Sequence, residues 1–157
     1  MKRLKLTCFT ISLILLTLVS QAQKTLHREP DVNKPKLFTN LPERIAIQVS
    51  ELEKLITNNT ATGKDVAVDM KGKGSATFAG KVVATASKYG DTIRSIVIRS
   101  TSFQGATFSL SAITQPDGKV TYTGRIMSFK HGDVYELEQS GEEYFLVRKN
   151  FYDLINE

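Results

Sequence analysis

Few side chains in this sequence could perform chemistry, and the strongest candidates are two carboxylates. Asp91 and Asp133 follow turn glycines at matching positions of two similar stretches. Two acids about 5–10 Å apart can hydrolyse a glycosidic bond. Asp also favours turns, because its side chain accepts hydrogen bonds from nearby backbone N–H groups. The turn role is therefore our main interpretation, and an Asp91–Asp133 acid pair is the alternative.

Other catalytic and metal-binding groups are scarce. The chain has two histidines, His27 and His131, and one cysteine, Cys8, so it lacks the ligand spacing of a zinc site. Ser128, His131 and Asp133 could supply a hydrolytic triad, but they share one hairpin tip, where their side chains would point apart. We therefore predict no catalytic residue, no metal and no cofactor, and a non-enzymatic protein is favoured.

Exposed aromatic residues suggest a binding surface instead. Phe103 lies in a turn and Phe129 is out of phase with the strand before it, so both are expected at exposed loop tips or, alternatively, as a cover over the end of a barrel. Tyr89 and His131 lie in similar turns and complete the predicted binding set. Three other tyrosines are in phase with core positions and are expected to fill the interior: Tyr122, Tyr135 and Tyr144.

The first 22 residues are typical of an export signal. Three basic residues precede an apolar run, Phe9–Val19, and the small residues Ser20 and Ala22 mark a cleavage site. The run has 11 residues, whereas a membrane-spanning helix needs about 20. We predict cleavage after Ala22, a periplasmic or secreted protein, and no membrane span in the mature chain.

Cleavage would change the composition of the mature protein. It removes Cys8, so no disulfide can form, and it removes three of the 21 basic residues against none of the 16 acidic ones. The formal net charge then falls from +5 to +2. A nucleic-acid-binding protein needs a dense basic surface, and a net charge this small gives no indication of one.

The mature chain is predicted to begin with a tether and continue as one domain. Residues 23–40 are polar, contain Pro30 and Pro35, and lack an apolar period, which indicates a flexible tether from which Leu37 and Phe38 could dock on the domain. Residues 41–157 form the predicted β-rich domain.

A strand and a short helix are predicted at the start of that domain. Alternation favours a strand over 44–49, and Ser50 and Glu53 form a capping box for a helix over about 50–57. The competing interpretation is one helix from Pro42, because apolar residues also recur there at helical spacing.

The remaining sequence predicts an antiparallel meander of about seven strands, closed as a small barrel or packed as a sandwich. Phe78, Val82, Ala84 and Ala86 would share one face of a strand, and a bulge is expected within 93–99. A short C-terminal helix is predicted after Asn150.

An internal repeat is the most specific pattern in the sequence. Residues Gly74–Ala84 align with Gly118–Ser128 at a constant offset of 44. This indicates a duplicated three-strand unit, although two similar hairpins could also converge by chance. Gly80 and Gly124 match within the repeat, and we interpret both as architectural, since a mid-strand glycine serves a bend or a close approach.

Two functions fit these observations. The first is an exported protein-binding module, such as an inhibitor or an envelope accessory protein. The alternative is a small β-barrel that carries an apolar molecule. An interior cavity of about 300 Å3 or more would favour the carrier, whereas a filled interior with an exposed strand edge would favour protein binding. The carrier's cavity would be lined by Phe108, Tyr122, Leu137 and Leu146.

Overall fold

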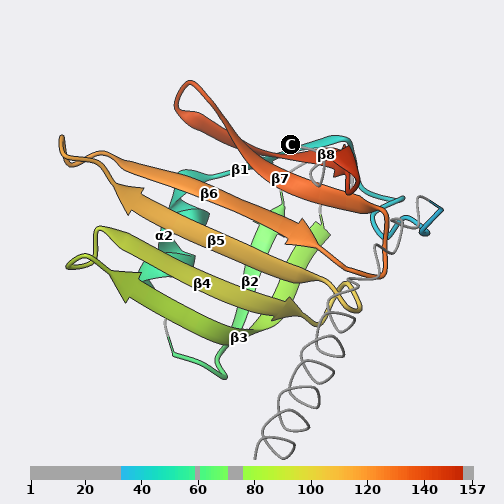
Figure 1. Cartoon of the computed structure of the whole chain (residues 1–157), viewed down its shortest axis with the longest axis horizontal. Helices are drawn as coiled ribbons and strands as arrows, with labels where there is room; N and C mark the ends of the chain where they lie inside the picture. The colour runs from blue at the N-terminus through green and yellow to red at the C-terminus, as the bar shows by residue number, and fades with distance from the viewer. Residues whose placement is uncertain (1–32, 59–60, 71–75, 154–157) are drawn as a thin grey trace, which may run out of the picture. The chain divides into compact units, whose positions relative to one another are not determined.

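The computed structural model describes residues 33–58, 61–70 and 76–153. These residues form a single antiparallel sheet of eight strands, curled into a half-barrel, and one helix (Figure 1). The elements are β1 (Arg44–Ile47), α2 (Val49–Asn58), β2 (Asp65–Met70), β3 (Ala76–Lys88), β4 (Ile93–Ser100), β5 (Thr107–Thr114), β6 (Val120–Met127), β7 (Asp133–Ser140) and β8 (Glu143–Asn150). The spatial order is β1-β8-β7-β6-β5-β4-β3-β2, so β2 to β8 form a continuous meander. The predicted mainly-β meander is confirmed, as one curled sheet rather than a two-sheet sandwich.

Helix α2 covers the inner face of the sheet, where it packs against β2, β4 and β5. Its apolar stripe, Leu52, Leu55 and Ile56, is buried, as the sequence predicts. The strand-then-helix interpretation is confirmed over the single helix. The predicted capping box is wrong, because the Gln48 carbonyl already accepts hydrogen bonds from the backbone N–H groups of residues 51 and 52. The helix therefore starts before Ser50, which cannot be its N-cap.

A bulge in β3 changes which side chains face inward. Val82 pairs with Ile98 and Ala84 pairs with Val97, so Val83 is an extra residue on β3. One extra residue shifts every later side chain to the opposite face. The predictions that Ala84 and Ala86 face inward, and that the extra residue lies in the following strand, are therefore wrong.

The two matched glycines permit close approach between strands, as predicted. A Cβ on Gly80 would lie 2.5 Å from the Arg99 carbonyl oxygen, and one on Gly124 would lie 2.5 Å from that of Ser109. Gly124 also lies next to the point where β6 separates from β7, because their pairing ends at Arg125.

Residues 33–43, here called the N-terminal strap, close one end of the half-barrel. Phe38 is 1% exposed and packs on Tyr135 and Phe103, with ring centroids 5.2 and 5.5 Å away. Docking of Phe38 was expected, but it occurs within the stretch predicted as a tether, so the packed domain starts before Leu41. The predicted signal and residues 23–32 lie outside the described residues.

The C-terminal part differs from the prediction where it is described. Strand β8 continues to Asn150, whose side-chain oxygen accepts a hydrogen bond from the Tyr152 N–H at 3.2 Å. Residues 151–153 form a turn, and the rest of the predicted helix lies outside the described residues. The repeat aligns β3–β5 with β6–β8, two sets of three consecutive strands.

Candidate functional site

The structure does not bring the predicted acid pair together. Asp91 lies in the β3–β4 turn and Asp133 follows the β6–β7 turn, and successive turns of a meander alternate between the two ends of the sheet. Asp91 accepts a hydrogen bond from the Ser87 hydroxyl. Asp133 is 2% exposed, and its two oxygens accept the N–H groups of Leu37 and Phe38 at 2.7 and 2.9 Å. Each carboxylate therefore stabilises local structure, and the expectation that they converge is wrong.

His131 contacts a serine without completing a triad. Its Nδ1 lies 2.9 Å from the Ser128 hydroxyl. Both oxygens of Asp133, the nearby acid, are already bound by the strap. Among the described residues, no third group is therefore placed to orient the imidazole as a triad requires.

The four predicted binding residues do not form one surface. Tyr89 and Phe129 are 78% and 77% exposed, as expected, but they lie at opposite ends of the sheet. Phe103 is not an exposed tip: it is half-buried and stacks on Phe78, with centroids 6.2 Å apart. His131, with Ser128, lies in the same turn region as Phe129.

The interior is occupied by side chains. Phe108, Leu137 and Leu146, expected to line a carrier's cavity, are buried members of one hydrophobic cluster, and Tyr122 packs against it. None of these four residues lines any of the three pockets described below. Phe78 and Phe108 contact edge to face at 5.6 Å within this cluster. These four residues therefore pack in or against the core, and the apolar carrier stays a prediction.

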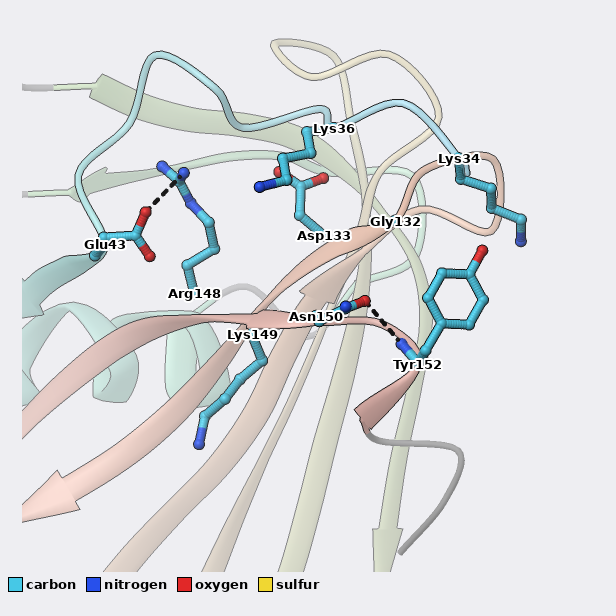
Figure 2. A pocket seen from close by; sticks show the side chains of 9 residues that line it. All are labelled: Lys34, Lys36, Glu43, Gly132, Asp133, Arg148, Lys149, Asn150 and Tyr152. Atoms are coloured by element: carbon cyan, nitrogen blue, oxygen red, sulfur yellow. Dashed lines mark hydrogen bonds and ion pairs between the residues drawn. The ribbon is translucent and has the colours of Figure 1, made fainter. Parts of the chain in front are cut away.

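A pocket of about 220 Å3 lies between the strap and the end of the sheet (Figure 2). Arg148 lines it, and its guanidinium forms an ion pair with Glu43 at 3.1 Å and also donates a hydrogen bond to the Leu41 carbonyl. Tyr135 donates to the Pro42 carbonyl, and burial raises the pKa of its hydroxyl, although Arg148 opposes that shift. These groups hold the strap in place, so we interpret the pocket as part of the packing between the strap and the sheet. A second pocket, of about 430 Å3, lies where β1 meets α2 and is lined in part by Val49, Glu143 and Tyr144.

The outer edge of β3 is the best candidate for a binding site. Strand β2 has six residues and β3 has 13, and β2 pairs with Ala76–Lys81. Beyond the bulge, Ala84–Lys88 pair with β4 on one side, and no described strand pairs with their other side. All five residues are exposed. The edge is thus a five-residue template for a further strand.

The hydrogen-bond alternation identifies the groups presented at this edge. The Thr114 N–H donates to the Thr92 carbonyl, so even-numbered residues of β4 bond to β5 and odd-numbered residues bond to β3. Through the β3–β4 register, Ala84, Ala86 and Lys88 then bond to β4. Thr85 and Ser87 consequently direct their backbone N–H and C=O groups outward.

A pocket of about 200 Å3 adjoins the free edge. Its lining comes from α2, β3, the β3–β4 turn and β4: Ile56, Thr85, Ala86, Ser87, Asp91, Arg94, Ser95 and Ile96. The bulge places Thr85 opposite Ile96 and Ser87 opposite Arg94, on the inner face. A free edge with an adjoining pocket is the arrangement by which sheets bind extended peptides.

Arg94 carries the main unsatisfied charge of this pocket. It is half-buried, and within the described part of the chain it makes no hydrogen bond or ion pair. Burial raises the pKa of the nearby Tyr122 hydroxyl, the charge of Glu53 raises it further, and Arg94 lowers it. The β4–β5 register pairs Arg94 with the buried Ala112, so the Arg94 side chain lies on the inner face of the sheet.

Sequence patterns alone do not reveal this site, because no single residue there is distinctive. One signal was available: a short predicted strand around 66–68 is followed by a much longer one over 78–86. Unequal neighbouring strands leave part of the longer strand unpaired, which creates an edge.

Comparison with known proteins adds no assignment: no family model, no curated protein and no solved structure matches the chain. Among the described residues, no helix is long and apolar enough to cross a membrane.

Proposed function

We propose that the protein is an exported, non-catalytic binding module that pairs the free edge of β3 with an extended segment of a partner protein. Export is proposed from the signal-like residues 1–22. The single observation that supports binding is the exposed stretch Ala84–Lys88, whose outer side pairs with no strand of the described residues and which adjoins a pocket of about 200 Å3.

The composition of this edge suits pairing. Natural edge strands are usually protected by proline, by several charged residues or by twisting bulges. Here the bulge precedes the free stretch, which contains no proline and one charged residue, Lys88. Five residues extend about 17 Å, enough for a peptide strand to form several main-chain hydrogen bonds.

Thr85→Pro tests the proposal directly. Proline removes the outward N–H of residue 85 but no hydrogen bond to β4, so the fold should tolerate it at this edge. Thr85→Ala is the matched control, because it changes the side chain and keeps the N–H. Peptides selected by the purified protein from a random 12-residue display library should bind the wild type and Thr85→Ala alike, and bind Thr85→Pro at least about tenfold more weakly.

Hydrogen exchange of the bound protein supplies a second measurement. The amides of Thr85 and Ser87 should gain protection when a selected peptide binds, because they become part of a ladder. Ser87→Pro replaces Thr85→Pro if the latter fails to fold by circular dichroism. Failure to select any peptide, or equal binding by the proline variant, would contradict the proposal.

A further inference from the structure

Building on the proposed binding function, we infer that the β3 pocket selects a partner segment with an acidic side chain, whose carboxylate pairs with Arg94. The observation that carries this inference is a half-buried arginine that lines a pocket and has no hydrogen-bonding or ion-pair partner in the described part of the chain. A guanidinium has five N–H donors, and partial burial without an acceptor is unfavourable. A carboxylate matches its planar, forked geometry.

The positions of the strands allow such a contact. Neighbouring strands lie about 4.8 Å apart, so a strand added to β3 would lie about 10 Å from β4. Ser87 stands between the added strand and Arg94 on the same face of the sheet, and its small side chain leaves the path open. Arg and Glu are both long side chains and can meet across that distance, which favours Glu over the shorter Asp.

The other half of the pocket predicts the neighbouring residue of the partner. Thr85 lies two residues before Ser87 and faces Ile96, and Ile56 of α2 lines the same pocket. In an added strand, side chains two residues apart point to the same face. The preferred segment therefore has an acidic and an aliphatic residue separated by one residue.

Asp91 opposes the attraction between Arg94 and the partner's carboxylate, so its removal should strengthen binding. Among the described residues that line the pocket it is the one acid, and it accepts a hydrogen bond from the Ser87 hydroxyl. Its negative charge repels an incoming carboxylate, whereas asparagine keeps an acceptor for the Ser87 hydroxyl. Asp91→Asn should therefore tighten the binding of acidic peptides.

The test repeats the display selection with charge variants. Peptides selected by the wild type should be enriched in Glu two positions from an aliphatic residue. Arg94→Gln should weaken the binding of these peptides about tenfold or more. Arg94→Glu should shift the selection to peptides with Lys or Arg, because the charge in the pocket is reversed. The control is Arg99→Gln, which removes an exposed charge from the same strand outside the pocket and should leave binding unchanged.

The outcomes separate this inference from the function on which it rests. If Thr85→Pro abolishes binding but the selected peptides show no acidic preference, or Arg94→Gln binds them as the wild type does, the role of Arg94 is wrong and edge binding stands. If no peptide depends on the edge, the proposed function itself fails. Circular dichroism and thermal unfolding of each variant show whether it is folded. If Arg94→Glu does not fold, the binding of the selected peptides by Arg94→Gln is sufficient to test the role of Arg94.

Discussion

Gly124 illustrates how one residue without a side chain directs the course of a strand. Its backbone approaches Ser109 and Leu110 of β5 so closely that a Cβ would meet the Ser109 carbonyl oxygen at 2.5 Å. Just beyond the pairing of β6 with β7, the Tyr144 hydroxyl lies 3.1 Å from the Tyr122 N–H and accepts its hydrogen bond. A side chain thus replaces a ladder hydrogen bond where the two strands diverge.

Replacing this glycine should destabilise the fold. In Gly124→Ala, the added methyl group must displace the backbone of β5, and overpacking of this kind costs about 1–3 kcal/mol. Urea unfolding measures the loss. The neighbouring substitution Thr123→Ala, at an exposed position, should change stability by about 0.5 kcal/mol or less. Equal free energies of unfolding for the two variants would show that β5 can move to accommodate the methyl group without loss of stability.

At the scale of the elements, the N-terminal strap is held by polar contacts to β7, β8 and the turn before β7. Asp133 binds two successive N–H groups of the strap, and the Gly132 N–H donates to the Pro35 carbonyl at 3.0 Å. At the other end of the strap, the Arg148 N–H donates to the Glu43 carbonyl at 2.8 Å. The strap has no regular secondary structure over 33–43, so these contacts provide the order that a strand or helix would otherwise provide.

Asp133→Asn should loosen the strap. An amide accepts through one oxygen, so one of the two N–H groups, at Leu37 or Phe38, would lose its partner, at a cost of about 1–3 kcal/mol. Amide hydrogen exchange should become faster at residues 37 and 38 before it changes in the sheet. Asp117→Asn is the control, since Asp117 accepts one hydrogen bond in an exposed turn. Unchanged exchange at both residues would mean that Phe38 packing alone holds the strap.

At the scale of the whole molecule, the two repeat-related halves of the sheet differ in a consequential way. The first strand of one half, β3, has 13 residues and a bulge, whereas its counterpart β6 has eight. The extra length extends β3 past β2 and creates the free edge. The position of the proposed binding site is therefore a property of the whole sheet, set by the mismatch of two strand lengths.

The stability of the whole domain should fall in alkaline solution. Burial raises the pKa of Tyr135 from its ordinary value of 10.0, so the folded state binds this proton more tightly than the unfolded state does. The resulting stabilisation is complete below about pH 10 and is lost as the pH rises through the higher value of the folded state. Thermal unfolding between pH 8 and pH 11 measures this loss. Tyr135→Phe should reduce the fall in unfolding temperature with pH above pH 10. An unchanged fall would mean that other groups cause the loss of stability.

The sequence by itself determined the fold class and the core. Two-residue alternation places Phe108, Leu110 and Ala112 on the buried face of β5, and turn residues separate the strands, because both signals depend on near neighbours in the chain. The stripe of α2 and the architectural role of Gly80 and Gly124 were likewise predictable. The start of α2 was not, because the side-chain pattern at Ser50 does not record which carbonyl accepts the first helical hydrogen bond.

Only the tertiary structure decided where partners meet. The bulge at Val83 reverses the faces of Ala84–Lys88, Phe38 turns part of an apparent tether into core, and the meander separates Asp91 from Asp133. Each outcome depends on register and on contacts between residues far apart in the chain. Local periodicity contains no information about either, so Thr85, Ser87 and Arg94 became a candidate site only when the sheet was assembled.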